Sequence, residues 1–471
     1  MVFHSPNFFV FFLLLLLPYF LWRSKRNALL AVANVIFYAA SGLGMLALFL
    51  AVTLIVFGCV HLMRRPGFGW VYQAALVFCI VNLCVFKYSL FLLSSISGVF
   101  SVHTALQGWA AEHIFLPVGI SFYTFHLISY LVDVRRGTTV PTPSFIKFWI
   151  YVALFPQLVA GPIMRGNELI PQLDEIEKKR IKWDEIKFGI YLFGVGLVKK
   201  VIFADPLAGI ANPLFARAYE LTPVESWMAA YTFGFQIYFD FSAYSDMALG
   251  IGYILGIKLV QNFNLPYISG SPSEFWKRWH ISLSRWIRDY IYIGLGGSRR
   301  SPARTQFNLF AAMMLSGLWH GAMWTFVIWG ALHGLLQAIH RIMRGLDRWP
   351  RIKRLRQSKA YRIAAVSVFF HIVIWTWVFF RAQSFGEAWH MTTQMAQVNW
   401  IALFTDSGMA LIVALYALHL FEYVLRRRQA EAARWWHVVP FPVRGLLYAA
   451  LLLVLFYYME GDAYDFIYFQ F

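Results

Sequence analysis

The chain has 471 residues, of which 59% are hydrophobic and 14% charged, and its formal net charge is +18. Ordinary soluble domains carry about 25% charged residues. This composition therefore excludes an ordinary soluble domain and predicts a polytopic membrane protein. Nucleic-acid binding is not indicated either, because the Lys and Arg residues stand in short clusters between apolar runs, as in cytoplasmic loops. The clusters are Arg23–Arg26, Arg64–Arg65, Arg135–Arg136, Lys178–Lys182, Arg341–Arg362 and Arg426–Arg428.

Apolar runs occupy most of the first hundred residues. They are Phe8–Trp22, Ala28–Ala40, Leu43–Met63 and Trp70–Leu93. The longer runs reach the roughly 20 residues that a spanning helix needs, and the shorter ones come close. No basic region precedes Phe8 and no A-x-A site follows Trp22, so the first run is expected to be a retained span. The segment Ser94–Glu112 has no Lys or Arg and is expected outside the cytoplasm.

The next two apolar segments contain polar or helix-breaking residues. In His113–Val132, Tyr123 and His126 are expected to form hydrogen bonds between helices, as polar side chains commonly do in lipid. Phe145–Ile163 is interrupted by two prolines and a glycine. A bent or re-entrant segment is therefore predicted there.

Charged residues also occur inside the following spans. Lys199 and Lys200 stand near the end of Ile186–Ala204, where their side chains are expected to snorkel towards water. Trp227–Leu255 contains FDFSAYSDMA, with Asp240 among its carboxylates. A carboxylate in an apolar segment must pair, accept hydrogen bonds or meet water. Both a structural or substrate-path role and acid–base catalysis remain open for it.

The stretch Ser271–Gly334 combines Trp and Arg residues with two histidines. His320 lies in an apolar run between Trp319 and Gly321, and His280 lies in KRWHISLSRW. Ionisable groups at membrane depth are functional candidates. Further spans are expected at Ile363–Phe380, Ile401–Val424 and Val443–Tyr458, which gives roughly ten to twelve in total. No internal repeat interrupts the chain, so a single membrane domain over residues 1–471 is predicted.

Several long segments resemble the membrane-bound O-acyltransferase (MBOAT) family, specifically its bacterial branch that O-acetylates polysaccharides such as alginate and cellulose. The matching segments are MVFHSPNF (1–8), LPVGISFYTF (116–125), FPQLVAGPI (155–163), YFDFSAYSDMALG (238–250), NFNLPYISGSPSEFWKRWHISLSRWIRDYIYIGLGG (262–297), GLWHGAMW (317–324), VFFRA (378–382) and FIYFQF (466–471). The resemblance implies a ring of helices with re-entrant helices and a central funnel, with a catalytic core at about 113–340 and a tail at 461–471.

The resemblance also implies roles for individual residues. His320 matches the family's catalytic histidine, and His280 matches its second catalytic position. The tail FIYFQF resembles the terminal motif of the small membrane partner of the D-alanylating members, in which Tyr468 would carry the acyl group. An aromatic belt that anchors the last helix is the alternative for this tail. Candidates for substrate binding are Trp319, Asp240, Tyr244, Asp246, Arg278, Ser284 and Arg288.

Acyl transfer from a thioester requires a base for the hydroxyl proton and donors for the oxyanion. A neutral imidazole suits the first task. The implied donor is acetyl-CoA as a substrate, with no bound cofactor. No metal site is expected, because His333 and His340 share a helix face without a third ligand. HxxxD, GxSxG, HExxH and Walker A sequences are absent, and His371 and His419 are expected to be structural.

The sequence therefore predicts an enzyme of the bacterial inner membrane that moves acetyl groups from cytoplasmic acetyl-CoA towards an exopolysaccharide. An extracytoplasmic acetyltransferase partner and membrane lipids are the expected partners, and nucleic acid is not. A peptidoglycan or lipid acyltransferase of the same family is the alternative. A polysaccharide exporter is less consistent with the sequence, because secondary transporters usually contain two related halves. The polymer, the acyl group and the oligomeric state stay open.

Overall fold

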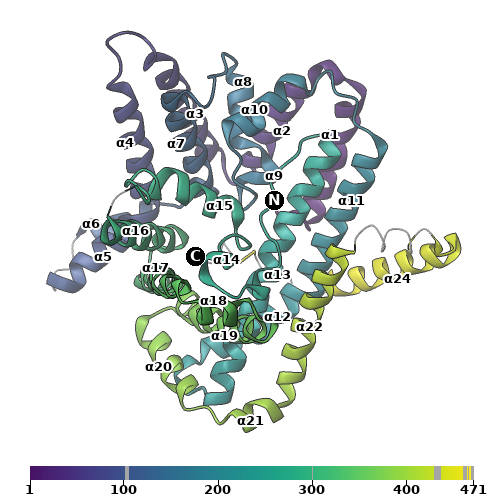
Figure 1. Cartoon of the computed structure of the whole chain (residues 1–471). Coiled ribbons are helices and arrows are strands. Elements are labelled where there is room, and N and C mark those ends of the chain that lie inside the picture. The colour runs from purple at the N-terminus through teal and green to yellow at the C-terminus, as the bar shows by residue number, and fades with distance from the viewer. Residues whose placement is uncertain are drawn as a thin grey trace. The chain divides into compact units, whose positions relative to one another are not determined.

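A computed structural model describes residues 1–100, 105–299, 301–428, 436, 438–459, 464, 466 and 467. Every regular element in these ranges is a helix (Figure 1). The protein is therefore an all-α polytopic membrane protein, as the composition predicts.

Five of the described helical segments are long and apolar enough to cross a membrane: Leu43–Leu62, Val71–Ser97, Lys359–Arg381, Ser407–Leu425 and Phe441–Tyr458. The pair Pro6–Leu21 and Arg23–Ala39, bent by 119°, could supply a sixth. This is fewer than the ten to twelve spans predicted from apolar runs. The difference arises because other runs are broken or hold buried polar groups. Phe145–Ile163 is broken in this way, and Pro223–Leu255 buries Asp240 and several hydroxyls.

The chain divides into two compact units. The first comprises residues 1–195 and 244–261, and the second comprises residues 196–243 and 262–471. Helices of the first are α1 (Pro6–Leu21), α2 (Arg26–Ala39), α3 (Leu43–Leu62), α4 (Val71–Leu83), α5 (Ser89–Phe100), α6 (Ala105–His113), α7 (Ile120–Arg136), α8 (Phe145–Ala153), α9 (Phe155–Leu158), α10 (Gly166–Glu175) and most of α11 (Trp183–Val198). Those of the second are α12 (Asp205–Ala216), most of α13 (Pro223–Leu255), α14 (Pro272–Phe275), α15 (Ile281–Trp286), α16 (Pro302–His320), α17 (Trp324–Arg344), α18 (Pro350–Gln357), α19 (Lys359–Arg381), α20 (Phe385–Ala396), α21 (Trp400–Thr405), α22 (Ser407–Arg427) and α24 (Phe441–Met459).

A buried, broken segment lies at the centre of the first unit. Helix α8 ends at Ala153, and α9 begins at Phe155 with a proline in its first turn. His126 on α7 lies 3.3 Å from the carbonyl of Val152 on α8, and its side chain is fully buried. The prediction of a bent segment is confirmed, and that of a hydrogen bond between helices is confirmed for His126. Non-helical backbone is tolerated here because protein, not lipid, surrounds it.

Helices α16 and α17 form an antiparallel hairpin in the second unit, connected by residues 321–323 (Figure 1). Glycines permit their close approach. A Cβ atom added to Gly317 would lie 2.2 Å from the carbonyl oxygen of Phe326, and one added to Gly330 would lie 2.5 Å from that of Met313. Any side chain at these glycines would separate the two helices, so the hairpin is set by small residues, as in other membrane helix pairs.

The lysines at the end of α11 are buried, and the prediction that they snorkel is wrong. The backbone over Lys199–Ala204 is a π-helix, a local distortion that is often found at functional sites. Lys199 pairs with Glu422 at 3.4 Å, and Lys200 pairs with Asp205 at 2.8 Å. The two side chains are 8% and 3% exposed. Carboxylates from elsewhere in the same unit pair with these ammonium groups, which sequence spacing did not reveal.

Candidate active site

His320 is the last residue of α16 and lies among aromatic rings. The backbone turns extended at Gly321, with φ −158° and ψ 153°, and only glycine fits there, because a Cβ atom would lie 2.1 Å from the ring of Phe326. The ring centroids of Trp329 and Phe380 each lie 5.2 Å from that of His320. The imidazole is 3% exposed. The end of α16 therefore presents it in a closed, apolar environment.

His280 precedes α15 and has left-handed backbone angles, with φ 43° and ψ 56°. Such a conformation costs a non-glycine residue about 1–3 kcal/mol and is concentrated at functional sites. The side chain is fully buried. The surrounding structure must therefore hold His280 in place against this strain.

Asn262 fixes the protonation of the His280 ring. Its Oδ1 accepts hydrogen bonds from the backbone N–H of Ser282 at 3.1 Å and from the Ser282 hydroxyl at 2.9 Å. The same oxygen lies 3.2 Å from Nδ1 of His280. Because a backbone N–H can only donate, the atom that faces Ser282 and His280 is the amide oxygen, and Nδ1 of a neutral His280 must carry the proton. Nε2 then presents a lone pair, and it accepts no hydrogen bond from any described residue.

The two histidines meet at one tryptophan. The ring centroid of Trp319 lies 4.9 Å from that of His320 and 6.1 Å from that of His280. The structure thus brings together three of the residues that the sequence singled out, from segments forty residues apart in the chain. Both imidazoles are buried in one aromatic cluster.

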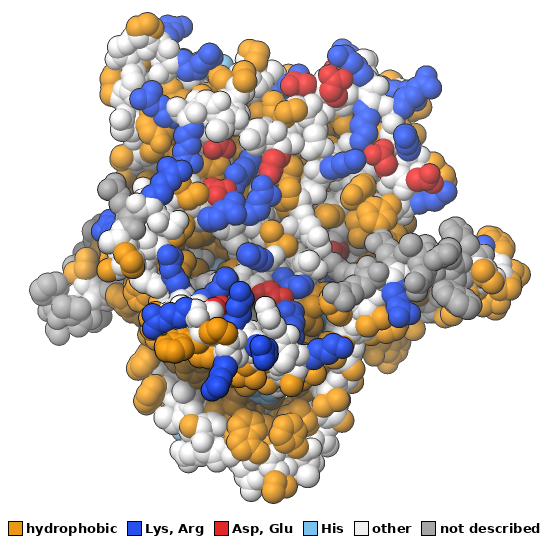
Figure 2. Space-filling model, in the orientation of Figure 1, with side chains coloured by type: hydrophobic (Ala, Val, Ile, Leu, Met, Phe, Trp, Pro, Cys, Tyr) orange, Lys and Arg blue, Asp and Glu red, His pale blue; other side chains and the backbone are white. Residues whose placement is uncertain are grey.

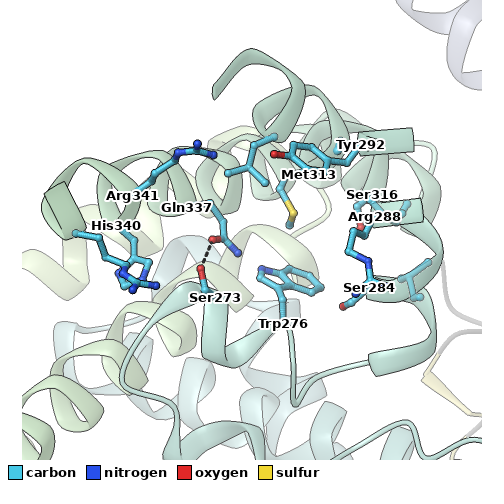
Figure 3. A pocket seen from close by; sticks show the side chains of 15 residues that line it. Ser273, Trp276, Ser284, Arg288, Tyr292, Met313, Ser316, Gln337, His340 and Arg341 are labelled. Atoms are coloured by element: carbon cyan, nitrogen blue, oxygen red, sulfur yellow. Dashed lines mark hydrogen bonds between the residues drawn. The ribbon is translucent and has the colours of Figure 1, made fainter. Parts of the chain in front are cut away.

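The ring of Trp276 meets that of Trp329 at 5.8 Å, and Trp276 lines a cavity of about 540 Å³ (Figure 3). The residues that line it come mainly from α15, α16 and α17 and include Trp276, Leu283, Ser284, Ile287, Arg288, Leu309, Met313, Ser316, Gln337, His340, Arg341 and Arg344. Its wall combines apolar side chains with polar ones, among them Gln337, whose Oε1 accepts a hydrogen bond from Ser273 at 2.9 Å. The volume is typical of a small-molecule site. Ser284 and Arg288, both predicted substrate-binding residues, lie in its wall.

Helical periodicity connects the cavity to the histidines. Residues four apart lie on the same face of a helix, one turn from each other. Ser316 lines the cavity on α16, and His320 follows one turn later. Ser284 lines it on α15, and its N–H donates to the carbonyl of His280 at 2.9 Å. The cavity wall therefore continues along both helices towards the two imidazoles.

Positive charge surrounds the outer part of the cavity. The side chains of Arg288, Arg341 and Arg344 are exposed. Arg288 also pairs with Asp289 at 2.7 Å. Figure 2 shows further Lys and Arg side chains gathered over α18, which follows α17 in the chain. An anionic ligand would find complementary charge at this end of the cavity.

The other predicted site residues have structural partners or lie elsewhere. Arg278 pairs with Glu274 at 3.1 Å and donates to the carbonyl of Asn264 at 3.0 Å. Asp240 pairs with Lys200 at 3.0 Å. Tyr244 and Asp246 belong to the first unit, where the ring of Tyr244 stacks on Phe3 at 4.5 Å. Tyr468 lies outside the described residues.

Asn262, Trp329 and Lys200 were not predicted as site residues. Asn262 opens the matching segment NFNLPY, and a search for amide partners of a buried histidine could have selected it. Trp329 follows His320 by nine residues in an apolar run, which gives no signal in one sequence.

The MBOAT family model, described as the membrane-bound O-acyltransferase family, matches residues 130–383. The chain therefore belongs to this family and is an O-acyltransferase. It is 41% identical to the probable alginate O-acetylase AlgI of Azotobacter vinelandii, over 84% of this chain and 78% of that protein. It is also 41% identical to the AlgI protein of Pseudomonas aeruginosa, over 85% and 77%. A peptidoglycan O-acetyltransferase of Helicobacter pylori is 34% identical, over 68% and 63%.

Proposed function

We propose that this O-acyltransferase takes acetyl groups from acetyl-CoA at the inner membrane of a bacterium for O-acetylation of an exopolysaccharide of the alginate or cellulose type. Similarity to two alginate O-acetylases over most of both chains supports the acceptor class. The observation that carries the chemistry is the meeting of His280 and His320 at Trp319, one helical turn from a cavity with a basic mouth.

In the proposed reaction, His320 removes the proton of an acceptor hydroxyl while the oxygen attacks the thioester carbonyl. The carbon–sulfur bond then breaks, and the imidazolium returns its proton to the departing thiolate of coenzyme A. The aromatic surroundings of His320 exclude water, which would otherwise compete as the acceptor. The Nε2 lone pair of His280 is proposed to accept a hydrogen bond from an amide N–H of the pantetheine arm and so to orient the acyl donor.

The cavity is proposed to hold the donor. Coenzyme A carries several phosphates on its nucleotide end and a narrow pantetheine arm that ends in the thioester. Guanidinium groups bind phosphates well because of their planar, bidentate geometry, and Arg288, Arg341 and Arg344 stand where the nucleotide would bind. The apolar wall around Trp276 and Met313 would hold the arm, with its thioester towards the histidines.

Kinetics with acetyl-CoA test this donor site. Arg341→Gln and Arg344→Gln should raise KM for acetyl-CoA by about tenfold each, as expected for a lost charge-assisted hydrogen bond, with a smaller change in kcat. Arg351→Gln on α18 is the matched control, because Arg351 is exposed and does not line the cavity. Equal KM values in all three variants would place the donor elsewhere.

We propose that the acetyl group travels from the donor to the polymer by way of the C-terminal tail and a partner protein. Tyr468 is proposed to accept the acetyl group first and to pass it to an extracytoplasmic acetyltransferase, which splits one difficult transfer into two easier ones. The Lys and Arg clusters are proposed to lie in the cytoplasm, as their bias predicts. Peptidoglycan is a second candidate acceptor, because a peptidoglycan O-acetyltransferase is 34% identical to the chain.

The deciding experiment follows the acetyl label. The full chain, reconstituted in lipid nanodiscs, is incubated with acetyl-CoA labelled in the acetyl group, and the protein is then digested and analysed by mass spectrometry. Label on the C-terminal peptide at Tyr468, chased onto alginate or cellulose oligomers when a partner acetyltransferase is added, is the expected result. Label that moves only onto peptidoglycan fragments would select the second acceptor. A chain that releases no coenzyme A under any of these conditions would contradict the proposed donor.

A further inference from the structure

A buried charge cluster in the second unit lies outside the proposed active site. Lys200 Nζ lies 2.8 Å from Oδ1 of Asp205 and 3.0 Å from Oδ1 of Asp240. The three side chains are 3%, 13% and 4% exposed. Two carboxylates facing one ammonium leave an excess of negative charge. Such a cluster is costly to bury unless further hydrogen bonds satisfy it.

The C-terminal segment supplies those hydrogen bonds. The backbone N–H of Ile467 donates to Oδ2 of Asp240 at 2.8 Å. Lys200 donates to the carbonyl oxygen of Tyr464 at 3.0 Å. An ammonium has three N–H groups, and Lys200 has three oxygens within 3.0 Å when the segment is bound. The cluster is therefore complete only with the segment in place.

The same segment reaches the neighbourhood of the histidines. Phe466 and Ile467 are 3% and 0% exposed. The ring centroid of Phe466 lies 6.0 Å from that of Phe241, and Phe241 meets the ring of His280 edge-on at 4.7 Å. Asp240 and Phe241 are adjacent on α13. Asp240 thus binds the backbone of the C-terminal segment, and Phe241 lies between the ring of Phe466 and that of His280.

We propose that Lys200, Asp205 and Asp240 form a docking site for the chain's own C-terminal segment and act as positioning residues for acyl transfer. Recognition is through backbone groups of Tyr464 and Ile467, with specificity from burial of the Phe466 and Ile467 side chains. The transfer role rests on the proposed function, in which Tyr468, the residue after Ile467 in the sequence, receives the acetyl group. The docking itself does not rest on it.

Hydrogen exchange measured by mass spectrometry on the full-length chain tests the docking. The expected result is that Asp240→Asn and Ile467→Pro speed exchange in the peptide 460–471 by about tenfold or more, since each removes one partner of a buried hydrogen bond. Ile467→Pro removes the N–H at the chain's end, where a folding defect is not expected. Ile467→Val keeps that N–H and is its control. Glu225→Gln is the control on α13, because Glu225 pairs with Arg217 in an exposed bridge.

Transfer kinetics on the same variants test the positioning role. Asp240→Asn and Ile467→Pro should lower kcat by about tenfold or more and leave KM for acetyl-CoA within about twofold, because the donor cavity is unchanged. Equal exchange of the tail peptide in the wild-type and variant chains would overturn the docking site. Faster exchange with an unchanged kcat would overturn the positioning role. If the wild-type chain transfers no acetyl group at all, the proposed function fails, and the exchange data still decide whether the tail is docked.

Discussion

Replacing Asn262 by alanine should remove the contact that keeps the proton of His280 on Nδ1, while the imidazole itself stays in place. The change removes the oxygen that accepts from Ser282 at 2.9 and 3.1 Å and from His280 at 3.2 Å. A net hydrogen bond is worth about 1 kcal/mol, which alone shifts the tautomer ratio by about fivefold. The His280 ring also loses a contact that orients it, which lowers the rate further, so kcat should fall by about 10- to 100-fold. The fall should be smaller than the roughly 10²–10⁴-fold expected for loss of a catalytic imidazole.

The assay is release of labelled acetyl groups from acetyl-CoA by the purified chain, with thermal unfolding followed in parallel. His280→Asn is the reference variant, because asparagine tolerates the left-handed backbone and removes the imidazole. Asn262→Asp is the control, because its carboxylate accepts the same three hydrogen bonds. Its charge stabilises the imidazolium, so the acid limb of its pH–rate profile should move to higher pH. A folded Asn262→Ala chain with wild-type kcat would refute the assigned role of this amide.

Three further outcomes are expected. His320→Ala should lower the transfer rate by about 10²–10⁴-fold while membrane insertion, measured by fractionation, is retained. Gly330→Leu should lower the thermal unfolding temperature, because its Cβ atom would lie 2.5 Å from the carbonyl of Met313, whereas Gly345→Ala, with nothing within 4 Å, should not. Tyr468→Phe should abolish acetylation of the polymer in cells; normal acetylation would leave the aromatic belt as the role of the tail.

Local sequence signals predicted much of the fold. The prolines and glycine of Phe145–Ile163 predicted its break, and the buried polar group of His126 predicted a bond to a neighbouring helix. Motif similarity selected His280 and His320, and the structure places both imidazole rings next to the ring of Trp319. Each of these features depends on residues close in sequence or on a family pattern, so a single chain carries enough information to find them.

Contacts between distant segments could not be predicted in this way. Lys200 and Tyr464 are 264 residues apart, and no spacing rule connects them. The sequence showed two lysines at the end of an apolar run, for which snorkelling is the usual arrangement. The ammonium group of Lys200 does not need to reach water, because the carboxylate of Asp240 lies 3.0 Å from it inside the protein. Hydropathy treats an apolar run alike whether protein or lipid surrounds it, so the apolar runs outnumber the five or six described helical segments that are long and apolar enough to cross a membrane.

The backbone at the two histidines explains how the site can exist at membrane depth. His320 ends α16 and His280 takes a left-handed conformation before α15, so each stands where regular helical hydrogen bonding is interrupted. Such interruptions are not tolerated against lipid. Here both side chains are almost fully buried in protein, and Asn262 and the glycines of the α16–α17 hairpin hold the surrounding segments in place. Because Ser316 and His320 share a helix face only while both are helical, a break one residue earlier would no longer hold position 320 one turn beyond Ser316 and the cavity. The positions of the breaks, more than the presence of imidazoles, therefore determine whether a donor in the cavity can reach them.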